Sequence, residues 1–301
     1  MIPRPRKMKL TEGTASSEVP VKERLCPQLG VEEYRIYISP KQIWLDGSGK
    51  TGFFYARTTL EQLRMIYGED LPCMEIEDGP AYSYRSFQID CARHYFSVDE
   101  LKKMIRMSAE FKLNHFHWHI SDDQGWRIES KRYPRLHEIG SVRAGDHFGN
   151  YHSDQKSGGY YTRDEVRDIV DYCKELGIEV VPEIDMPGHV TAILAAYPNL
   201  SCLGQPVEVG VKAGIFKELF CAGREETFTF IEKLLDDLME LFPGKYFHIG
   251  GDEAPKERWN GCENCQKRMK EEGLKNAQEL QGYFCNRIAS YLQSKGRIPI
   301  V

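Results

Sequence analysis

Two adjacent carboxylic acids follow a short apolar run near residue 250, and side chains of this type can carry out acid–base chemistry. Residues 246–249 lead into Gly250 and Gly251, and then into Asp252 and Glu253. Glycine has no Cβ, so backbone or ligand can approach closely where the strand becomes a loop. Acids placed side by side repel each other, which tends to raise one pKa, as an acid catalyst near neutral pH requires. The alternative is a helix N-cap aspartate followed by a solvated glutamate; the flanking glycines favour catalysis.

Three further groups of polar residues also follow apolar runs. They are Arg93 with His94, Asp122 with Asp123, and residues 185–189. In a (β/α)₈ barrel the loops after the strands form the catalytic face. The four groups are therefore expected to share one face of a sheet.

The elements that position these residues alternate between strand and helix from about residue 85. Strands are expected at residues 86–90, 113–120, 178–184, 245–249 and 297–301. The capping-box spacings at residues 97–100 and 162–165 predict helix starts, as does Asn276. A further helix is expected at residues 228–241.

Near-continuous apolar strands separated by helices indicate a parallel α/β sheet. We expect a (β/α)₈ TIM-type barrel of which about five strands are present. A doubly wound sheet is the alternative, and the lack of a glycine-rich phosphate loop after the first strand argues against it.

Residues 1–80 differ from the rest and predict a small α/β domain, with the barrel portion at residues 81–301. Residues 34–38 and 42–45 alternate like strands, and residues 58–61 predict a capped helix start with Leu60, Leu63 and Ile66 on one face. The chain stops inside the fifth predicted strand. We therefore expect a fragment of a longer reading frame, or a half that a complementing C-terminal barrel segment completes.

Composition excludes several classes of function. A net charge of −5 and an isoelectric point near 6.0 argue against a nucleic-acid surface. No apolar run approaches the roughly 18 residues that a membrane helix needs. The sequence contains no signal peptide, so the default localisation is cytoplasmic. The nine cysteines are odd in number and scattered, unlike a disulfide framework.

Two other patterns could bind metal. His115, His117 and His119 alternate along one strand and point to one face, as the ligands of a metal-dependent hydrolase would. Cys262 and Cys265 have zinc-ligand spacing but no second pair, so packing at a helix start is favoured. We expect no metal and no cofactor.

Four segments together resemble the family 20 glycoside hydrolases, the β-N-acetylhexosaminidases. They are residues 84–95, 115–127, 181–189 and 246–253, and the resemblance runs from about residue 30 to the end. It implies a retaining mechanism without an enzymic nucleophile, in which the 2-acetamido carbonyl of the substrate attacks the anomeric carbon. By this resemblance Glu253 is the general acid, and Asp252 orients the acetamido N–H.

The resemblance also implies residues that bind the sugar. Arg85 corresponds to an arginine that grips sugar hydroxyls, since its planar donors suit vicinal hydroxyls; a strand-end salt bridge is the alternative. Asp122, Asp185 and His189 correspond to residues that line the same pocket, and a buried Asp–His pair holding loops together is the alternative for them. His248 is expected to support the acid pair.

The expected activity is removal of terminal GlcNAc or GalNAc from oligosaccharides or glycoconjugates by an exo-β-N-acetylhexosaminidase. The family's acetamido pocket has tryptophan walls from strands after the fifth, and these are absent here. A non-catalytic sugar-binding fragment, or half of a split enzyme, is therefore the alternative. Trp126 and Trp259 could stack on a sugar or pack the loops. The preference between GlcNAc and GalNAc stays open.

Overall fold

The structure is a computed structural model that describes residues 1–301. The backbone contacts divide it into two compact units. The first contains residues 1–87, 102–115 and 172–179, and the second contains residues 88–101, 116–171 and 180–301.

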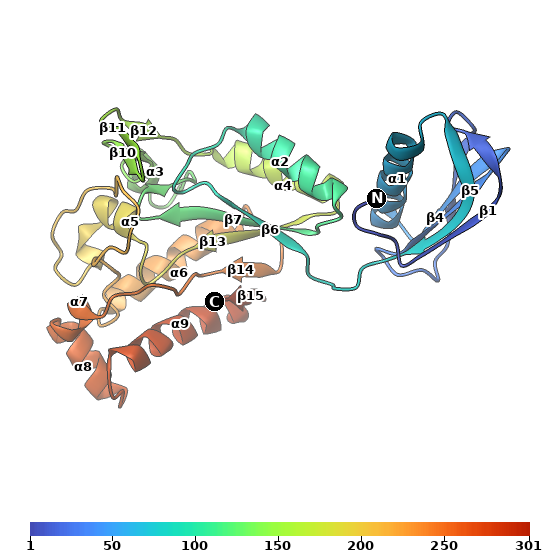
Figure 1. Cartoon of the computed structure of the whole chain (residues 1–301). Helices are drawn as coiled ribbons and strands as arrows, with labels where there is room; N and C mark the ends of the chain where they lie inside the picture. The colour runs from blue at the N-terminus through green and yellow to red at the C-terminus, as the bar shows by residue number, and fades with distance from the viewer. The chain divides into compact units, whose positions relative to one another are not determined.

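The first unit contains a five-stranded sheet and the helix α1 (Lys50–Tyr67) (Figure 1). The strand order is β1-β5-β3-β4-β2, and only β2 and β4 pair in parallel. Its strands are β1 (Lys7–Ser16), β2 (Val21–Leu25), β3 (Tyr34–Ser39), β4 (Gln42–Gly47) and β5 (Asp70–Asp78).

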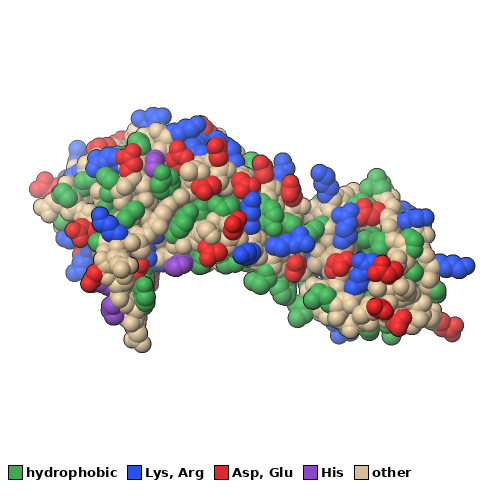
Figure 2. Space-filling model, turned by 90° about the horizontal axis from the view of Figure 1, so that it is seen from above, with side chains coloured by type: hydrophobic (Ala, Val, Ile, Leu, Met, Phe, Trp, Pro, Cys, Tyr) green, Lys and Arg blue, Asp and Glu red, His purple; other side chains and the backbone are tan.

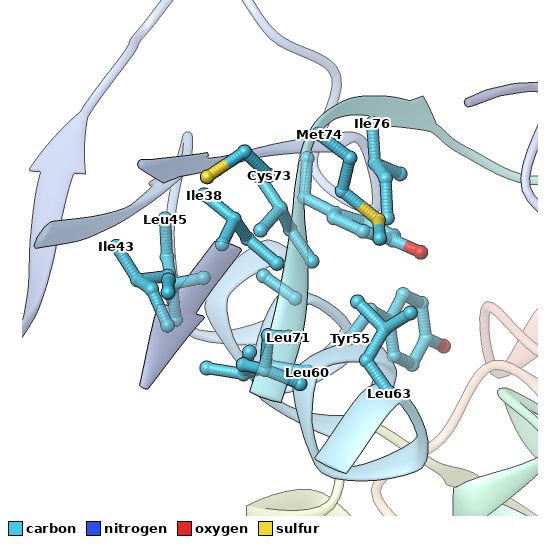
Figure 3. Close-up of a cluster of buried hydrophobic side chains, with 14 residues drawn as sticks. Ile38, Ile43, Leu45, Tyr55, Leu60, Leu63, Leu71, Cys73, Met74 and Ile76 are labelled. Carbon is cyan, nitrogen blue, oxygen red and sulfur yellow. The ribbon is translucent and has the colours of Figure 1, made fainter. Parts of the chain in front are cut away.

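The core of this unit lies between the sheet and α1. In β3 the buried Ile36 and Ile38 alternate with more exposed residues, as expected for a strand with one face on a core. Both belong, with Leu60 and Leu63 one turn apart on α1, to one cluster of buried side chains, in which Figure 3 labels Ile38, Leu60 and Leu63.

The predicted start of this helix was wrong. α1 begins at Lys50, directly after its N-cap Gly49, and Thr58 lies inside it. The Thr58 hydroxyl donates to the Phe54 carbonyl four residues earlier, a bond that a helix interior allows. Ile66, expected on the buried face, is 54% exposed because the helix turns it away from the sheet.

The larger sheet has the strand order β15-β14-β13-β7-β6, with the short β8 paired to β7. β13, β14 and β15 pair in parallel. Along β6 and β7, bonds join residue 115 to residue 85 and residue 91 to residue 119, so these strands also run in parallel. The strands are β6 (Ser86–Asp90), β7 (His115–Asp122), β8 (Gly125–Trp126), β13 (Glu179–Ile184), β14 (Tyr246–His248) and β15 (Ile298–Ile300).

This order confirms the predicted parallel α/β sheet and excludes the doubly wound alternative. The five strands follow one another across the sheet in the same order as along the chain. A doubly wound sheet instead reverses its strand order at a switch point. The carboxyl ends of all five strands therefore meet along one edge.

The capping boxes form as predicted. Glu100 accepts bonds from the backbone and hydroxyl of Ser97, and Glu165 does so from Thr162. The Asn276 side chain accepts the N–H groups of Gln278 and Glu279. The helices are α2 (Val98–Glu110), α4 (Arg163–Glu175), α5 (Thr191–Ala196), α6 (Glu225–Met239), α7 (Glu257–Asn260), α8 (Glu263–Glu271) and α9 (Ala277–Ser294), with the 3₁₀ turn η1 (Pro198–Leu200).

A long excursion between β7 and α4 is held by the buried Arg127. Its guanidinium donates to the carbonyls of Cys91, Ala92, Ser141 and Gly159, which fixes the excursion against the end of β6. The excursion carries α3 (Arg135–Glu138), β9 (Val142–Arg143), β10 (Asp146–Phe148), β11 (Tyr151–Ser153) and β12 (Ser157–Gly158).

The surface mixes charges of both signs. Figure 2 shows basic and acidic side chains interspersed over the visible face rather than gathered by sign. None of the helices combines the length and apolar character needed to cross a bilayer.

Candidate active site

The loop after β14 carries the acid pair, and the Asp185 side chain packs against the two glycines of this loop. Gly250 and Gly251 have positive φ values of 64° and 118°. A Cβ on Gly250 would overlap the Asp185 carboxylate, and the Gly251 N–H donates to Asp185 Oδ1 at 3.2 Å. The close approach predicted at this glycine pair is therefore made by the carboxylate at the end of the neighbouring strand.

Neither acid caps a helix. α7 begins at Glu257 and its N-cap is Lys256, so the helix-cap alternative is excluded. Asp252 is exposed, and the Glu253 side chain is 51% exposed. An open hollow of about 660 Å³ lies against Glu253, with Lys256 and Gln281 in its lining. The acid is accessible to a substrate.

His189 connects Glu253 to the end of β7. Its Nε2 lies 3.4 Å from Glu253 Oε2, and its Nδ1 lies 3.1 Å from Asp122 Oδ1 and 3.2 Å from Asp123 Oδ2. Burial opposes the charged imidazole, but the bonds to Asp122 and Asp123 outweigh it and raise the pKa of His189 to about 11. The imidazole therefore carries positive charge at neutral pH.

Backbone strain is concentrated at this contact. His189 and Glu253 both have positive φ, 55° and 42°, in a region that side chains rarely adopt. Such conformations persist where surrounding packing fixes them, often at functional sites.

Asp122 is the anionic centre of the site. Its carboxylate accepts from His119 Nε2 at 2.8 Å and pairs with Arg93 Nη2 at 2.7 Å, in addition to the His189 contact. Burial would raise the pKa of Asp122, but the bonds from His119 and His189 and the charge of Arg93 lower it to about 2. An unbroken series of contacts thus runs from Arg93 through Asp122 and His189 to Glu253.

Asp185 has the opposite electrostatic character. Burial, followed by the charge of Asp252, raises the pKa of Asp185 to about 8. The repulsion expected between acids at this edge therefore acts on a third carboxyl, at the end of the neighbouring strand β13. Asp185 is protonated near neutral pH.

Three histidines, two on β7 and one on β14, surround the carboxylate of Glu183 on β13, which the sequence did not predict as part of the site. His117 Nε2 lies 2.7 Å and His248 Nδ1 3.0 Å from the buried Glu183 carboxylate, and His119 Nδ1 also contacts it. The alternation predicted for His115 does not bring it there. His115 bonds to Asn114 and its ring stacks on Tyr84, with centroids 4.0 Å apart.

Arg85, predicted to bind sugar hydroxyls, is held by hydrogen bonds within the first unit, and its role as a sugar-binding residue stays a prediction. Its donors bond the Lys112 and Tyr82 carbonyls at 2.8 Å, the Tyr55 hydroxyl at 3.0 Å and the Glu32 carboxylate. These partners are all in the first unit. The strand-end salt bridge, the alternative for Arg85, is what forms.

The arginine that the site does contain is Arg93. Arg85 precedes β6, whereas Arg93 follows its carboxyl end, where the other polar residues gather. Its side chain is 39% exposed and pairs with Asp90 and Asp122. Position relative to the strand was therefore the signal in the sequence that distinguishes the two arginines.

The tryptophans considered as a sugar platform are buried. Trp126 and Trp259 have no exposed surface; their indole N–H groups donate to the Ile128 and Phe220 carbonyls. Both pack the loops.

Two family models match this chain. The model described as glycosyl hydrolase family 20, catalytic domain, matches residues 82–301, and the model for domain 2 of the same family matches residues 2–79.

Curated relatives and solved structures agree with these matches. The chain is 44% identical to a beta-hexosaminidase of Porphyromonas gingivalis over 88% of this chain and 35% of that protein. It is 36% identical to a beta-hexosaminidase of Akkermansia muciniphila over 99% of this chain and 61% of that protein. The chain thus spans about a third to three fifths of the length of these relatives.

Among solved structures, a crystal structure of a beta-N-acetylhexosaminidase superposes with a TM-score of 0.93 at 36% identity, over 99% of this chain and 64% of the other. The beta-N-acetylhexosaminidase of Bacteroides fragilis gives 0.85 at 35% identity, over 99% and 65%. On the family models and these similarities, the chain belongs to glycosyl hydrolase family 20.

Proposed function

We propose that the protein is an exo-acting β-N-acetylhexosaminidase that removes terminal GlcNAc or GalNAc from glycans. The observation that carries this proposal is the acid pair itself. Glu253 is accessible, the buried His189 contacts it, and Asp252 is exposed beside it on the same loop. Family membership and the beta-hexosaminidase relatives support the same activity.

In the proposed mechanism the substrate supplies the nucleophile. Its acetamido carbonyl oxygen attacks the anomeric carbon, while Glu253 donates a proton to the departing glycosidic oxygen. The ionised Glu253 then takes a proton from water, which opens the oxazolinium ring with overall retention. Asp252 accepts the acetamido N–H and balances the positive charge that develops on the ring.

His189 positions the proton donor. Its Nε2 lies 3.4 Å from the Glu253 carboxyl, and Asp122 and Asp123 hold the opposite nitrogen. When Glu253 loses its proton, the cation beside it stabilises the new carboxylate. Arg93 is proposed to donate to sugar hydroxyls, in the role that the sequence assigned to Arg85.

The fold of the active protein is proposed to be a (β/α)₈ barrel. The strand order, which follows the chain order, supports this proposal, as does the gathering of polar residues after the strands. The remaining walls of the sugar pocket would come from later strands or from a complementing C-terminal segment.

Calorimetry with a GlcNAc-thiazoline, a mimic of the cyclic intermediate, tests the proposed site. The protein should bind it, and Asp252→Asn should weaken binding at least about tenfold, because the carboxylate partner of the protonated ring nitrogen is lost. Glu12→Gln, which changes an exposed acid on β1 in the first unit, is the control and should bind like wild type. Equal affinity for wild type and Asp252→Asn would contradict the role assigned to Asp252, and no binding at all would contradict the proposed sugar site.

A further inference from the structure

Four of the nine cysteines converge on one point in the second unit. Cys202, Cys221, Cys262 and Cys265 place their sulfur atoms within 4.8 Å of one another. Cys265 lies 3.8 Å from Cys202 and 3.7 Å from Cys221, and Cys221 lies 3.8 Å from Cys262. Three of the four are buried, and Cys202 is partly buried.

These spacings match a tetrahedral metal site. With zinc–sulfur bonds of about 2.3 Å, the edges of a tetrahedron are about 3.8 Å long. From this geometry we propose that Cys202, Cys221, Cys262 and Cys265 bind one structural zinc ion. Four thiolates and no open position are the ligand set of a closed structural site rather than a catalytic one.

The sequence did not reveal this site because its halves are distant. Cys262 and Cys265 looked like a lone pair, since their partners lie 41 and 63 residues earlier, in a segment with little regular structure. The expectation of a packing pair and no metal is therefore replaced by this proposal. Two disulfides are the chemical alternative, but they would need only pairwise contacts, whereas Cys221 and Cys265 each contact two other sulfurs.

The backbone around the cluster supports thiolate ligands. The Gly223 N–H donates to the Cys221 sulfur, a bond that stabilises a coordinated thiolate. Cys262 is the N-cap of α8 and Cys265 lies in its first turn, where the helix dipole favours negative charge. A Cβ on Gly223 would overlap the backbone of Asn264, so the two segments are in direct contact.

The proposed ion joins two loops that follow neighbouring strands. Cys202 and Cys221 lie in the segment between η1 and α6, downstream of β13. Cys262 and Cys265 lie at the start of α8, downstream of β14 and the acid loop, and the contact between Cys202 and Cys265 joins this start to the segment after α5. The Trp259 indole bond to the Phe220 carbonyl ties the same segments. Zinc would thus clamp the loop that carries Asp252 and Glu253 to the preceding βα unit.

Metal content and thiol counts test the proposal directly. The protein, purified without added metal, should contain one zinc per chain by elemental analysis and native mass spectrometry. After denaturation with a chelator and no reductant, all nine cysteines should react with a thiol reagent. Two disulfides would leave nine minus four, or five, reactive thiols and would overturn the proposal, as would iron or no metal.

Variants locate the ion. Cys265→Ser should lose at least about tenfold in zinc affinity in a competition assay with a chromogenic chelator. Cys173→Ala removes another buried cysteine, one outside the cluster, and should retain one zinc. If Cys265→Ser does not fold, cobalt replacement in the wild-type protein gives the same answer. Tetrahedral thiolate absorption would support the site, and its absence would contradict it.

Discussion

At the scale of single residues, the site works through alternating charges. Arg93, Asp122, His189 and Glu253 follow one another through contacts of 2.7, 3.1 and 3.4 Å. Each buried charge therefore has an opposite charge beside it, which offsets the cost of taking it out of water. This arrangement leaves Glu253 as the exposed end of the series.

The two arginines give a matched pair of variants. Arg93→Lys should raise KM for an aryl N-acetylglucosaminide about tenfold or more, because a lysine cannot reproduce the planar donors toward vicinal hydroxyls. Arg85→Lys should leave KM unchanged and lower the free energy of unfolding by about 1–3 kcal/mol, since it loses partly buried hydrogen bonds. Steady-state kinetics and urea denaturation check both; a rise in KM for Arg85→Lys alone would reverse the assignment.

Asp185 predicts a specific pH dependence of stability. Its pKa is raised to about 8 in the folded protein, so between about pH 4 and 8 the native state holds a proton that the unfolded chain has lost. This group's contribution to stability therefore falls as the pH rises through that window, by up to about 1.4 kcal/mol per pH unit.

Asp185→Asn removes that titration while keeping the side-chain shape. The free energy of unfolding of the variant minus that of the wild type should be about 1–3 kcal/mol larger at pH 7.5 than at pH 5. Urea denaturation at the two pH values measures this difference. A difference that stays constant with pH would show that Asp185 is ionised in the native protein.

At the scale of elements, local signals in the sequence predicted the parallel strands and the capped helices α2, α4 and α9. The strand at residues 86–90 and both capping boxes have the bounds or bonds expected. They were predictable because periodicity and caps depend on residues a few positions apart. The start of α1 was not, because the packing of Gly52 against Glu33 lies outside any local window.

The parts of the site that escaped prediction depend on several elements at once. Glu183 sits inside an apolar strand, and its three histidine partners come from β7 and β14. The cysteine cluster likewise combines two loops. Asp122, Asp185, His189 and the acid pair were found because each follows a strand, and the same rule applied to β6 would have chosen Arg93.

Gly250 provides a test at this scale. Gly250→Ala should lower the free energy of unfolding by about 2–4 kcal/mol and reduce activity, because a Cβ meets the Asp185 carboxylate in a left-handed conformation. Gly282→Ala, in α9 with open space around it, should instead stabilise by about 0.5–1 kcal/mol. Chemical denaturation of both variants is the measurement; a tolerated Gly250→Ala would mean that the loop does not pack on Asp185 as described.

At the scale of the whole molecule, the two units have different tasks. The first holds its own core and the Arg85 and Lys112 ion pairs, whereas every residue proposed for catalysis lies in the second. The strand order of the second unit brings the loops after β6, β7, β13 and β14 to one edge. The proposed activity thus requires these loops to fold together at one edge of the sheet, where Glu253 is the proton donor.

The most direct test of this account is the turnover of Glu253→Gln on an N-acetyl-β-glucosaminide, with Glu12→Gln on β1 as the control. The amide cannot donate the proton, so kcat should fall about 10²–10⁴-fold. The fall should be larger for a disaccharide than for an aryl glycoside, because a poor leaving group depends more on protonation. Glu12→Gln should keep wild-type rates. Unchanged turnover in Glu253→Gln would contradict the assignment of Glu253 as the general acid.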